Sequence, residues 1–345
     1  MTQGPASAEL VNSPVSVIVP VLNEADDLQA AVSAILDQQW APGIEVVLAV
    51  GPSSDGTEAV AAAIAAADPR VRVVANPSGR TPDALNAAIG ASSNDPVIRV
   101  DAHTELPDGY IATAVRTLAD TGADNVGGIM QPTGRTDFER AVAVAMTSPI
   151  GVGSAVYHTG GQAGEAESVY MGAFRRETLE RVGGYDPRFT RAQDWEMNHR
   201  IRESGGTVWF TPEMVVTYRP RSNVRALVRQ YFQYGQWRRL VMKVHGQTRR
   251  RVSALRYLAP PVLVLGLLTS LVCSLAGWLL PATPVVEALR DAIAAPVAYL
   301  VAVVAASIWA GRRLRPAALV WLPCVIVLMH MAWGVGFLRG EKLPE

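Results

Sequence analysis

The stretch VSVIVPVLNEADDL, residues 15–28, joins an apolar run of strand length to a short polar cluster. Residues 15–19 predict a buried strand that ends at Pro20, and from Leu28 onward apolar residues recur at helical spacing. Asn23 is a suitable N-cap for that helix, and the acidic residues after it favour the positive end of the helix dipole. The stretch therefore predicts a strand, a turn and a helix in that order.

The same alternation continues along the chain. Strand-like and helix-like runs take turns at residues 45–50, 58–67, 71–75, 81–90 and 97–100. This order predicts an α/β fold, with a mostly parallel sheet and helices on both of its faces. Ligands bind such sheets at the carboxyl ends of the strands, and Asn23, Asp55 and Asp101 fall there.

Features outside the strands narrow the class of protein. A dinucleotide-dependent oxidoreductase is excluded, because no Gly-x-Gly-x-x-Gly follows the first strand. The two cysteines, Cys273 and Cys324, lie in apolar stretches and predict neither a disulfide nor a metal site. Residues 151–164 are rich in Gly and polar side chains, and they predict a mobile loop that covers a site.

Charge is unevenly distributed along the 345 residues, although 31 acidic and 31 basic side chains balance overall. Residues 20–110 hold 13 acids and 4 bases, whereas residues 218–257 hold 11 bases and no acid. A basic block of this kind binds phosphates of nucleic acid or of a membrane surface. Because the block leads directly into an apolar run, we expect membrane lipids as its partner and no nucleic acid.

Three apolar runs follow the basic block, at residues 258–280, 292–310 and 317–338. The first has 23 residues without a charge, about 34 Å of helix, which is enough to span the hydrocarbon core. Residues 1–13 lack a secretory signal, so we expect the preceding domain to stay in the cytoplasm. The positive-inside rule then places the arginines of residues 312–315 inside, and both the 281–291 link and the tail outside. Arg339 and Lys342 in that tail run against the rule.

These patterns predict a multi-pass membrane protein with its first domain in the cytoplasm. The expected parts are an N-terminal tail (1–14), an α/β domain (15–220), a basic amphipathic interface segment (221–257), three transmembrane helices (258–338) and a tail (339–345).

Four motifs stand in order at the ends of the predicted elements. They are the opening stretch, SSDGT at 53–57, DAH at 101–103 and QDWEMNHRIR at 193–202. Together they resemble the inverting family 2 glycosyltransferases, which have the GT-A fold, and in particular the succinoglycan-type membrane glucosyltransferases of bacteria. The resemblance implies transfer of one sugar, with inversion, from a nucleotide-sugar donor to a lipid-linked acceptor during synthesis of cell-surface polysaccharide or glycolipid. A UDP-sugar is the expected donor, and the oligomeric state stays open.

The resemblance also implies which residues hold the donor. The candidates are Pro20, Asn23, Glu24, Asp55, Arg80 and Asp101. Helix capping is an alternative role for Asn23 and Asp55, and a solvated surface position is the alternative for Arg80. Val50 and Gly51 stand where the family usually has two acidic residues, so the carboxylate that reads the base is missing here.

A divalent cation is expected at Asp101 and His103, which occupy the position of the family's Asp-x-Asp motif. Such an ion bridges the two phosphates of the donor and neutralises the departing diphosphate. Either Mn²⁺ or Mg²⁺ can serve, and an imidazole ligand suits Mn²⁺ better.

Asp194 is the candidate general base, because inverting transfer needs a carboxylate that removes the proton of the acceptor hydroxyl. Gln193 replaces the acid that usually precedes it, and a helix N-cap is the alternative role of Asp194. Four further residues are expected on the acceptor or diphosphate side: Glu196, Gln233, Trp237 and Arg238. Gln233, Gln236 and Trp237 form a partial match to the Gln-x-x-Arg-Trp motif of processive synthases, with Gln236 in the place of the arginine, and Arg238 follows directly.

Two alternative functions remain open at this level. A processive polysaccharide synthase is disfavoured by the incomplete motif and by the small number of predicted spans. A non-catalytic, membrane-tethered nucleotide-binding regulator is favoured by the missing acids at Val50, Gly51 and Gln193, and disfavoured by Asp101 and Asp194.

Overall fold

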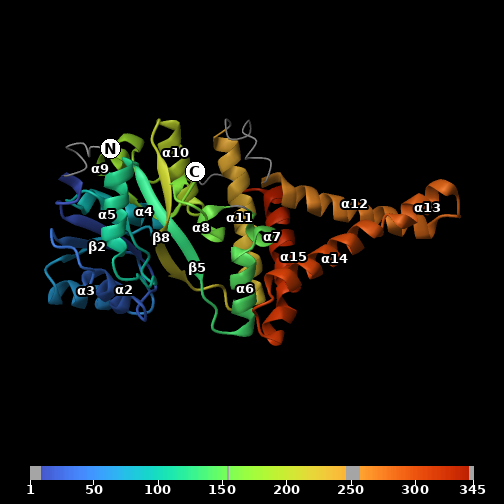
Figure 1. Cartoon of the computed structure of the whole chain (residues 1–345), viewed down its shortest axis with the longest axis horizontal. Coiled ribbons are helices and arrows are strands. Elements are labelled where there is room, and N and C mark those ends of the chain that lie inside the picture. Colours follow the sequence, from blue (N-terminus) through green and yellow to red (C-terminus); the bar gives the residue numbers. More distant parts are fainter. Residues whose placement is uncertain (1–8, 154, 246–256, 342–345) are drawn as a thin grey trace. The chain divides into compact units, whose positions relative to one another are not determined.

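The computed structural model describes residues 9–153, 155–245 and 257–341 (Figure 1). The chain divides into two compact units, and each is described by itself. The first is built from residues 9–131 and 155–218, and the second from residues 132–153, 219–245 and 257–341.

The first unit contains a mixed sheet with strand order β3-β2-β1-β4-β7-β5-β8-β6. The predicted parallel part is confirmed, since β1 pairs in parallel with β2 and β4, and β2 with β3. The antiparallel part was not predicted, and it begins where β7 pairs with both β4 and β5. The strands are β1 (Val15–Val21), β2 (Ile44–Val50), β3 (Val71–Ala75), β4 (Val97–Arg99), β5 (Asn125–Pro132), β6 (Gly164–Glu165), β7 (Tyr170–Phe174) and β8 (Val208–Tyr218).

Helices cover both faces of this sheet, because successive side chains of a strand point to opposite faces. Val17 and Val19 of β1 belong to a core shared with α2, α3 and α5. Ile18 belongs to a second core shared with α4, α9 and α10. The helices of this unit are α2 (Leu28–Leu36), α3 (Thr57–Ala67), α4 (Thr81–Ala91), α5 (Tyr110–Thr121), α8 (Val156–Thr159), α9 (Arg176–Val182) and α10 (Gln193–Glu203).

Two local predictions need correction. Strand β1 continues through Pro20 to Val21. Residues 151–164, expected as one loop, contain the short helix α8 and the last two residues of another short helix. Their expected mobility stays a prediction.

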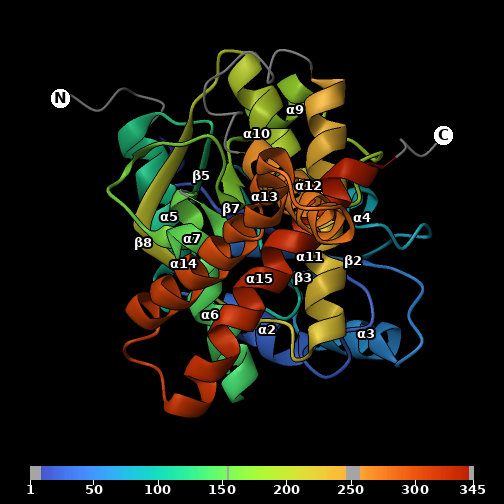
Figure 2. The same ribbon diagram turned by 90° about the vertical axis from the view of Figure 1, so that its right-hand side faces the viewer.

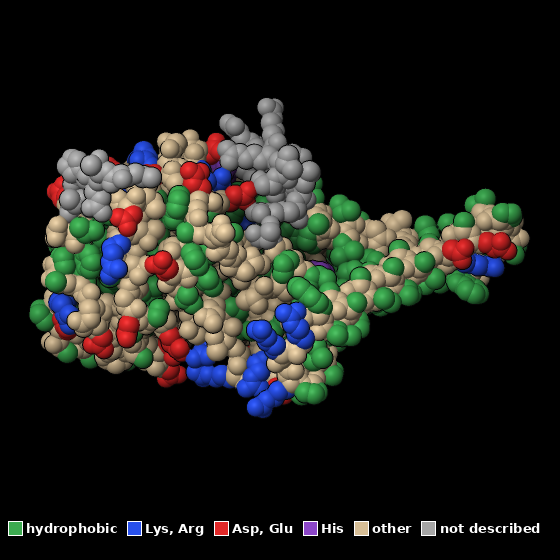
Figure 3. All heavy atoms as spheres, in the orientation of Figure 1, with side chains coloured by type: hydrophobic (Ala, Val, Ile, Leu, Met, Phe, Trp, Pro, Cys, Tyr) green, Lys and Arg blue, Asp and Glu red, His purple; other side chains and the backbone are tan. Residues whose placement is uncertain are grey.

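The second unit is helical, and three of its helical stretches are long and apolar enough to cross a membrane: Ala259–Leu279, Pro284–Ala310 and Pro316–Arg339. The second stretch was expected to begin at residue 292, but in the structure it begins at Pro284. Its first part, α13, packs back along α12, and Arg290 Nε donates to the carbonyl oxygen of Gly277 at 2.9 Å. Figure 3 shows the largely apolar surface of this hairpin, with charges gathered near α13. The helices are α6 (Asp137–Thr147), α7 (Pro149–Val152), α11 (Val224–Val244), α12 (Ala259–Leu279), α13 (Pro284–Asp291), α14 (Ala294–Ala310) and α15 (Pro316–Arg339).

Helices α11 and α15 approach each other closely at two glycines. A Cβ added to Gly235 would lie 2.0 Å from the carbonyl oxygen of Trp333, and one added to Gly336 would lie 2.0 Å from that of Phe232. Small residues let helix backbones come this near. The contact therefore depends on the absence of side chains at both positions.

Replacing Gly235 by Ala should destabilise the second unit, because overpacking of this kind costs about 1–3 kcal/mol. The matched control is Gly266→Ala in α12, where an added Cβ meets nothing within 4 Å. Helix propensity alone favours Ala there by about 1 kcal/mol. We expect the midpoint of thermal unfolding in detergent to fall for Gly235→Ala and to stay or rise for Gly266→Ala. Equal midpoints would contradict the close approach of α11 and α15.

Candidate active site

The turns that follow β1 and β2 are tied to each other by hydrogen bonds. Asp55 Oδ2 accepts from the backbone N–H of Ala25 at 3.1 Å, and Asp55 Oδ1 accepts from the Thr57 hydroxyl at 2.5 Å. The Thr57 hydroxyl in turn accepts from the N–H of Glu24 at 2.8 Å. The bond from Thr57 lowers the pKa of Asp55, so this carboxylate stays ionised. Asp55 thus fixes the shape of the rim at the carboxyl ends of two strands.

Asn23 does not cap the helix that follows it. Helix α2 begins only at Leu28, and the residue in the N-cap position is Asp27. The side-chain oxygen of Asn23 instead accepts from the N–H of Ser54 at 2.9 Å, and its backbone adopts a left-handed φ of 55°. The capping role was therefore wrong, because a bond to the neighbouring turn takes the side chain.

Three other residues near these turns are placed by the structure. Pro20 lies inside β1. A Cβ at Gly51 would lie 3.2 Å from Cα of Gly79, a tight contact, so an acidic side chain there would require a small shift of the neighbouring chain. Arg80 is 44% exposed and pairs with Asp83 at 2.7 Å. Contact of Pro20 or Arg80 with a donor stays a prediction.

A buried arginine of β4, missed at the sequence level, joins the two central carboxylates. The Arg99 side chain is 4% exposed, and its Nη2 lies 2.9 Å from Asp101 Oδ1. Its Nη1 donates to Asp194 Oδ1, which comes from α10. A buried charge needs partners of this kind. A lone arginine inside the run VIRV was the available signal, since such a run otherwise predicts a buried apolar strand.

Asp194 is suited to accept a proton near neutral pH. Burial raises its pKa to about 6, Arg99 opposes that rise, and the charge of Asp101 adds to it. The side chain keeps 22% of its surface exposed, so a substrate can reach it. Asp194 does not cap α10, because the N-cap position belongs to Ala192 and Asp194 lies inside the first turn. Its carboxylate turns to Arg99 instead.

His103 faces Glu24 across the site, with Nδ1 2.9 Å from Glu24 Oε1. This carboxylate raises the pKa of His103. Among the described residues no group of three or more His, Cys, Asp or Glu is arranged to hold a metal ion. Both contacts of Asp101 with Arg99 use Oδ1, which leaves Oδ2 for another partner, and the contact of His103 with Glu24 uses Nδ1, which leaves Nε2. Two protein donors of this kind fit a cation whose other ligands come from a bound diphosphate.

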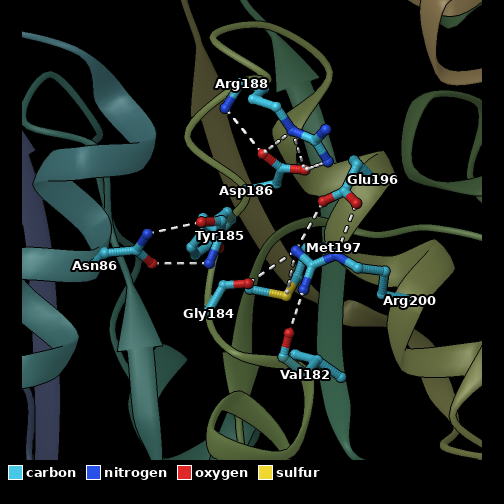
Figure 4. A network of polar contacts seen from close by, with 9 residues as sticks. All are labelled: Asn86, Val182, Gly184, Tyr185, Asp186, Arg188, Glu196, Met197 and Arg200. Carbon is cyan, nitrogen blue, oxygen red and sulfur yellow. Dashed lines mark hydrogen bonds and ion pairs between the residues drawn. The ribbon is translucent and has the colours of Figure 1, made fainter. Parts of the chain in front are cut away.

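Glu196 supports the loop before α10 (Figure 4). The residue is 1% exposed, and its carboxylate pairs with Arg200 Nε at 2.7 Å. Arg200 also donates to the carbonyl oxygens of Val182 and Gly184, at 2.6 and 2.8 Å. This placement favours a structural role over the expected contact with an acceptor.

The remaining candidates belong to α11 in the second unit. Trp237 is buried there, and the guanidinium of Arg238 lies 4.3 Å from the ring of Tyr257. Gln233 is partly exposed on the same helix. Contact of these three with donor or acceptor stays a prediction.

The sequence and the fold were compared with those of known proteins. Residues 16–183 match the family model described as glycosyl transferase family 2. The chain is 30% identical over 336 residues to the succinoglycan biosynthesis protein ExoA of Rhizobium meliloti (strain 1021), with 97% of each chain covered. It is 21% identical to the dolichyl N-acetyl-alpha-D-glucosaminyl phosphate 3-beta-D-2,3-diacetamido-2,3-dideoxy-beta-D-glucuronosyltransferase of Methanococcus voltae, over 66% of this chain and 74% of that one. The crystal structure of S. aureus TarS 1-349 in complex with UDP-GlcNAc matches with a TM-score of 0.49 and 15% identity, over 66% of this chain and 65% of that one.

The full-length similarity to ExoA, the matching family model and the sheet with carboxylates at its strand ends agree with one another. The chain therefore belongs to glycosyltransferase family 2, has the GT-A fold and is a glycosyltransferase.

Proposed function

We propose that this enzyme transfers one sugar, with inversion, from a UDP-sugar to a lipid-linked acceptor at the cytoplasmic face of the bacterial inner membrane. The observation that carries the proposal is the bridge from Asp101 through Arg99 to Asp194. The bridge brings Asp101, the proposed donor-side carboxylate, close to Asp194, the proposed general base, at one edge of the sheet.

Asp194 is the general base of the proposed reaction. Its carboxylate takes the proton of the acceptor hydroxyl while that oxygen bonds to the anomeric carbon and the bond to the diphosphate breaks. Arg99 binds one oxygen of Asp194 and so holds the carboxylate in place. The pKa of about 6 keeps most of this base ionised at neutral pH.

Asp101 Oδ2 and His103 Nε2 are the groups that would hold a divalent cation. When bound, the cation supplies positive charge to the departing diphosphate. Glu24 holds Nδ1 of His103 and so turns Nε2 outward, as carboxylates commonly do behind histidine ligands.

The lipid-linked acceptor is supported by two relatives and by the apolar helices. The name of the M. voltae relative gives a dolichyl-linked sugar phosphate as its substrate, and the name of ExoA assigns it to polysaccharide synthesis. Three helical stretches of this chain are apolar and long enough to cross a membrane. An enzyme anchored in this way meets an acceptor that is confined to the bilayer.

Asp194→Asn should remove the base with little change in shape. We expect the variant to fold and bind donor, and to lose transfer by about 10²–10⁴-fold. The assay offers UDP-, GDP- and dTDP-sugars with Mn²⁺ or Mg²⁺ and a membrane lipid extract to the detergent-purified protein. Glu196→Gln is the comparison, and it should lower thermal stability more than turnover per folded molecule. Wild-type turnover in Asp194→Asn would remove this residue from the mechanism.

The pH dependence of kcat/KM should report the ionisation of Asp194. The base acts only when ionised, so activity should fall as the pH drops below about 6, the pKa of Asp194. Because Arg99 lowers this pKa, Arg99→Gln should move the acidic limb to higher pH, and Arg99→Lys should move it less. A limb that stays in place in Arg99→Gln would show that Asp194 is not the group that titrates.

Asp101→Ala should weaken donor binding in the presence of metal by about 10-fold or more. Calorimetry with UDP-sugar, with Mn²⁺ or with chelator, measures this directly. Glu180→Ala, an exposed carboxylate on α9, is the control and should bind donor normally. If the affinity for the donor changes neither with the metal nor with the Asp101 substitution, Asp101 is not part of the donor site.

A further inference from the structure

Helix α15 is held by segments that precede the first membrane helix in the chain. Near its start, the Trp321 ring meets the Phe138 ring of α6 edge-on, with centroids 5.4 Å apart. In its second half, His330 Nε2 donates to the carbonyl oxygen of Ile150 in α7 at 2.6 Å. Figures 1 and 2 show α15 alongside α6 and α11.

The carboxyl end of α15 is held by α11. Gln236 Nε2 donates to the carbonyl oxygen of Gly340 at 2.8 Å, and Arg239 Nη1 donates to that of Phe337 at 3.1 Å. From Trp321 to Gly340 these contacts extend over about 28 Å of helix, nearly the thickness of a hydrocarbon core. Both ends of α15 therefore touch segments that come before α12.

The three supporting segments lie on one side of the bilayer. No candidate membrane span occurs between α6 and α11 in the described chain. Helix α6 has Asp137, Glu139 and Arg140 at its start, and α11 has Arg238 and Arg239 near its end. Charged side chains of this density are too costly to place in hydrocarbon. A helix whose two ends both contact segments on one side of the bilayer has both of its ends on that side.

We propose that α15 does not cross the bilayer, and that it lies in the interface on the same side as the link at residues 312–315. Its uncovered apolar side chains include Val320, 75% exposed, and Val335, 45% exposed, and these fit the boundary between headgroups and acyl chains. Exposed arginines precede it in the link, and Arg339 ends it, which fits an anionic leaflet. Only α12 and the α13–α14 stretch then cross.

This arrangement removes the conflict with the positive-inside rule. If α15 stays in the interface, Arg339 and the tail remain on the same side as the basic link. The inference requires only that the chain is inserted in a membrane. It does not depend on the proposed sugar transfer.

Cysteine accessibility tests the proposal in the full-length protein. In a Cys273→Ser, Cys324→Ser background, single cysteines replace Ala282 in the hairpin turn, Arg313 in the link and Glu341 after α15. A membrane-impermeant maleimide is applied to intact and to permeabilised spheroplasts. We expect Glu341→Cys to behave like Arg313→Cys, with labelling only after permeabilisation, whereas Ala282→Cys is labelled in intact cells. Labelling of Glu341→Cys in intact cells while Arg313→Cys is protected would overturn the proposal.

A fusion to the carboxyl terminus of the wild-type chain gives an independent readout that needs no cysteine replacement. Green fluorescent protein at that position should fluoresce, and periplasm-dependent alkaline phosphatase should be inactive. Active phosphatase with a dark fluorescent protein would mean that α15 crosses the membrane.

Discussion

The buried charge of Arg99 constrains the rest of the first unit. A guanidinium that is 4% exposed cannot stay in the core without carboxylate partners, because an unpaired buried charge costs several kcal/mol. Asp101 lies two residues further along the chain, but Asp194 comes from α10, 95 residues away in the sequence. Pairing all three therefore fixes α10 against the end of β4. The carboxyl ends of the parallel strands form the edge of the site, and pairing with Arg99 places α10 at that edge.

Two carboxylates in the first turn of α10 differ in their exposure to solvent and in the charges that surround them. Glu196 is 1% exposed and is satisfied by Arg200, which holds the carbonyl groups of the preceding loop. Asp194 is 22% exposed and shares its arginine with Asp101. The second arrangement raises the pKa of Asp194 to about 6, a value that suits the proposed transfer of a proton near neutral pH. The first gives a fixed charge that supports its neighbour.

Sequence patterns predicted the parts of the fold that depend on neighbouring residues. The runs that became β1 to β4 and helices α2 to α4 were visible because burial on a strand or helix face leaves a local period. The antiparallel strands were not visible, since their pairing depends on residues far apart in the chain. The same limit explains the caps assigned to Asn23 and Asp194, whose side chains bond to Ser54 and Arg99 instead. Motif positions indicated Asp101 and Asp194, but only the folded chain shows the arginine between them.

The apolar C-terminal helices show a related limit of hydropathy. All three candidate spans have similar hydropathy, yet 11% of the α12 window and of the α13–α14 window is buried by protein, against 39% of the α15 window. Hydropathy counts apolar side chains without distinguishing whether lipid or protein covers them. In α15 the glycine at 336 and the carbonyl groups of its last turn serve contacts with α11. Part of its apolar character is thus explained by packing against an amphipathic helix, as in the core of a water-soluble domain. The length and hydropathy of such a helix therefore do not show how much of its surface faces lipid.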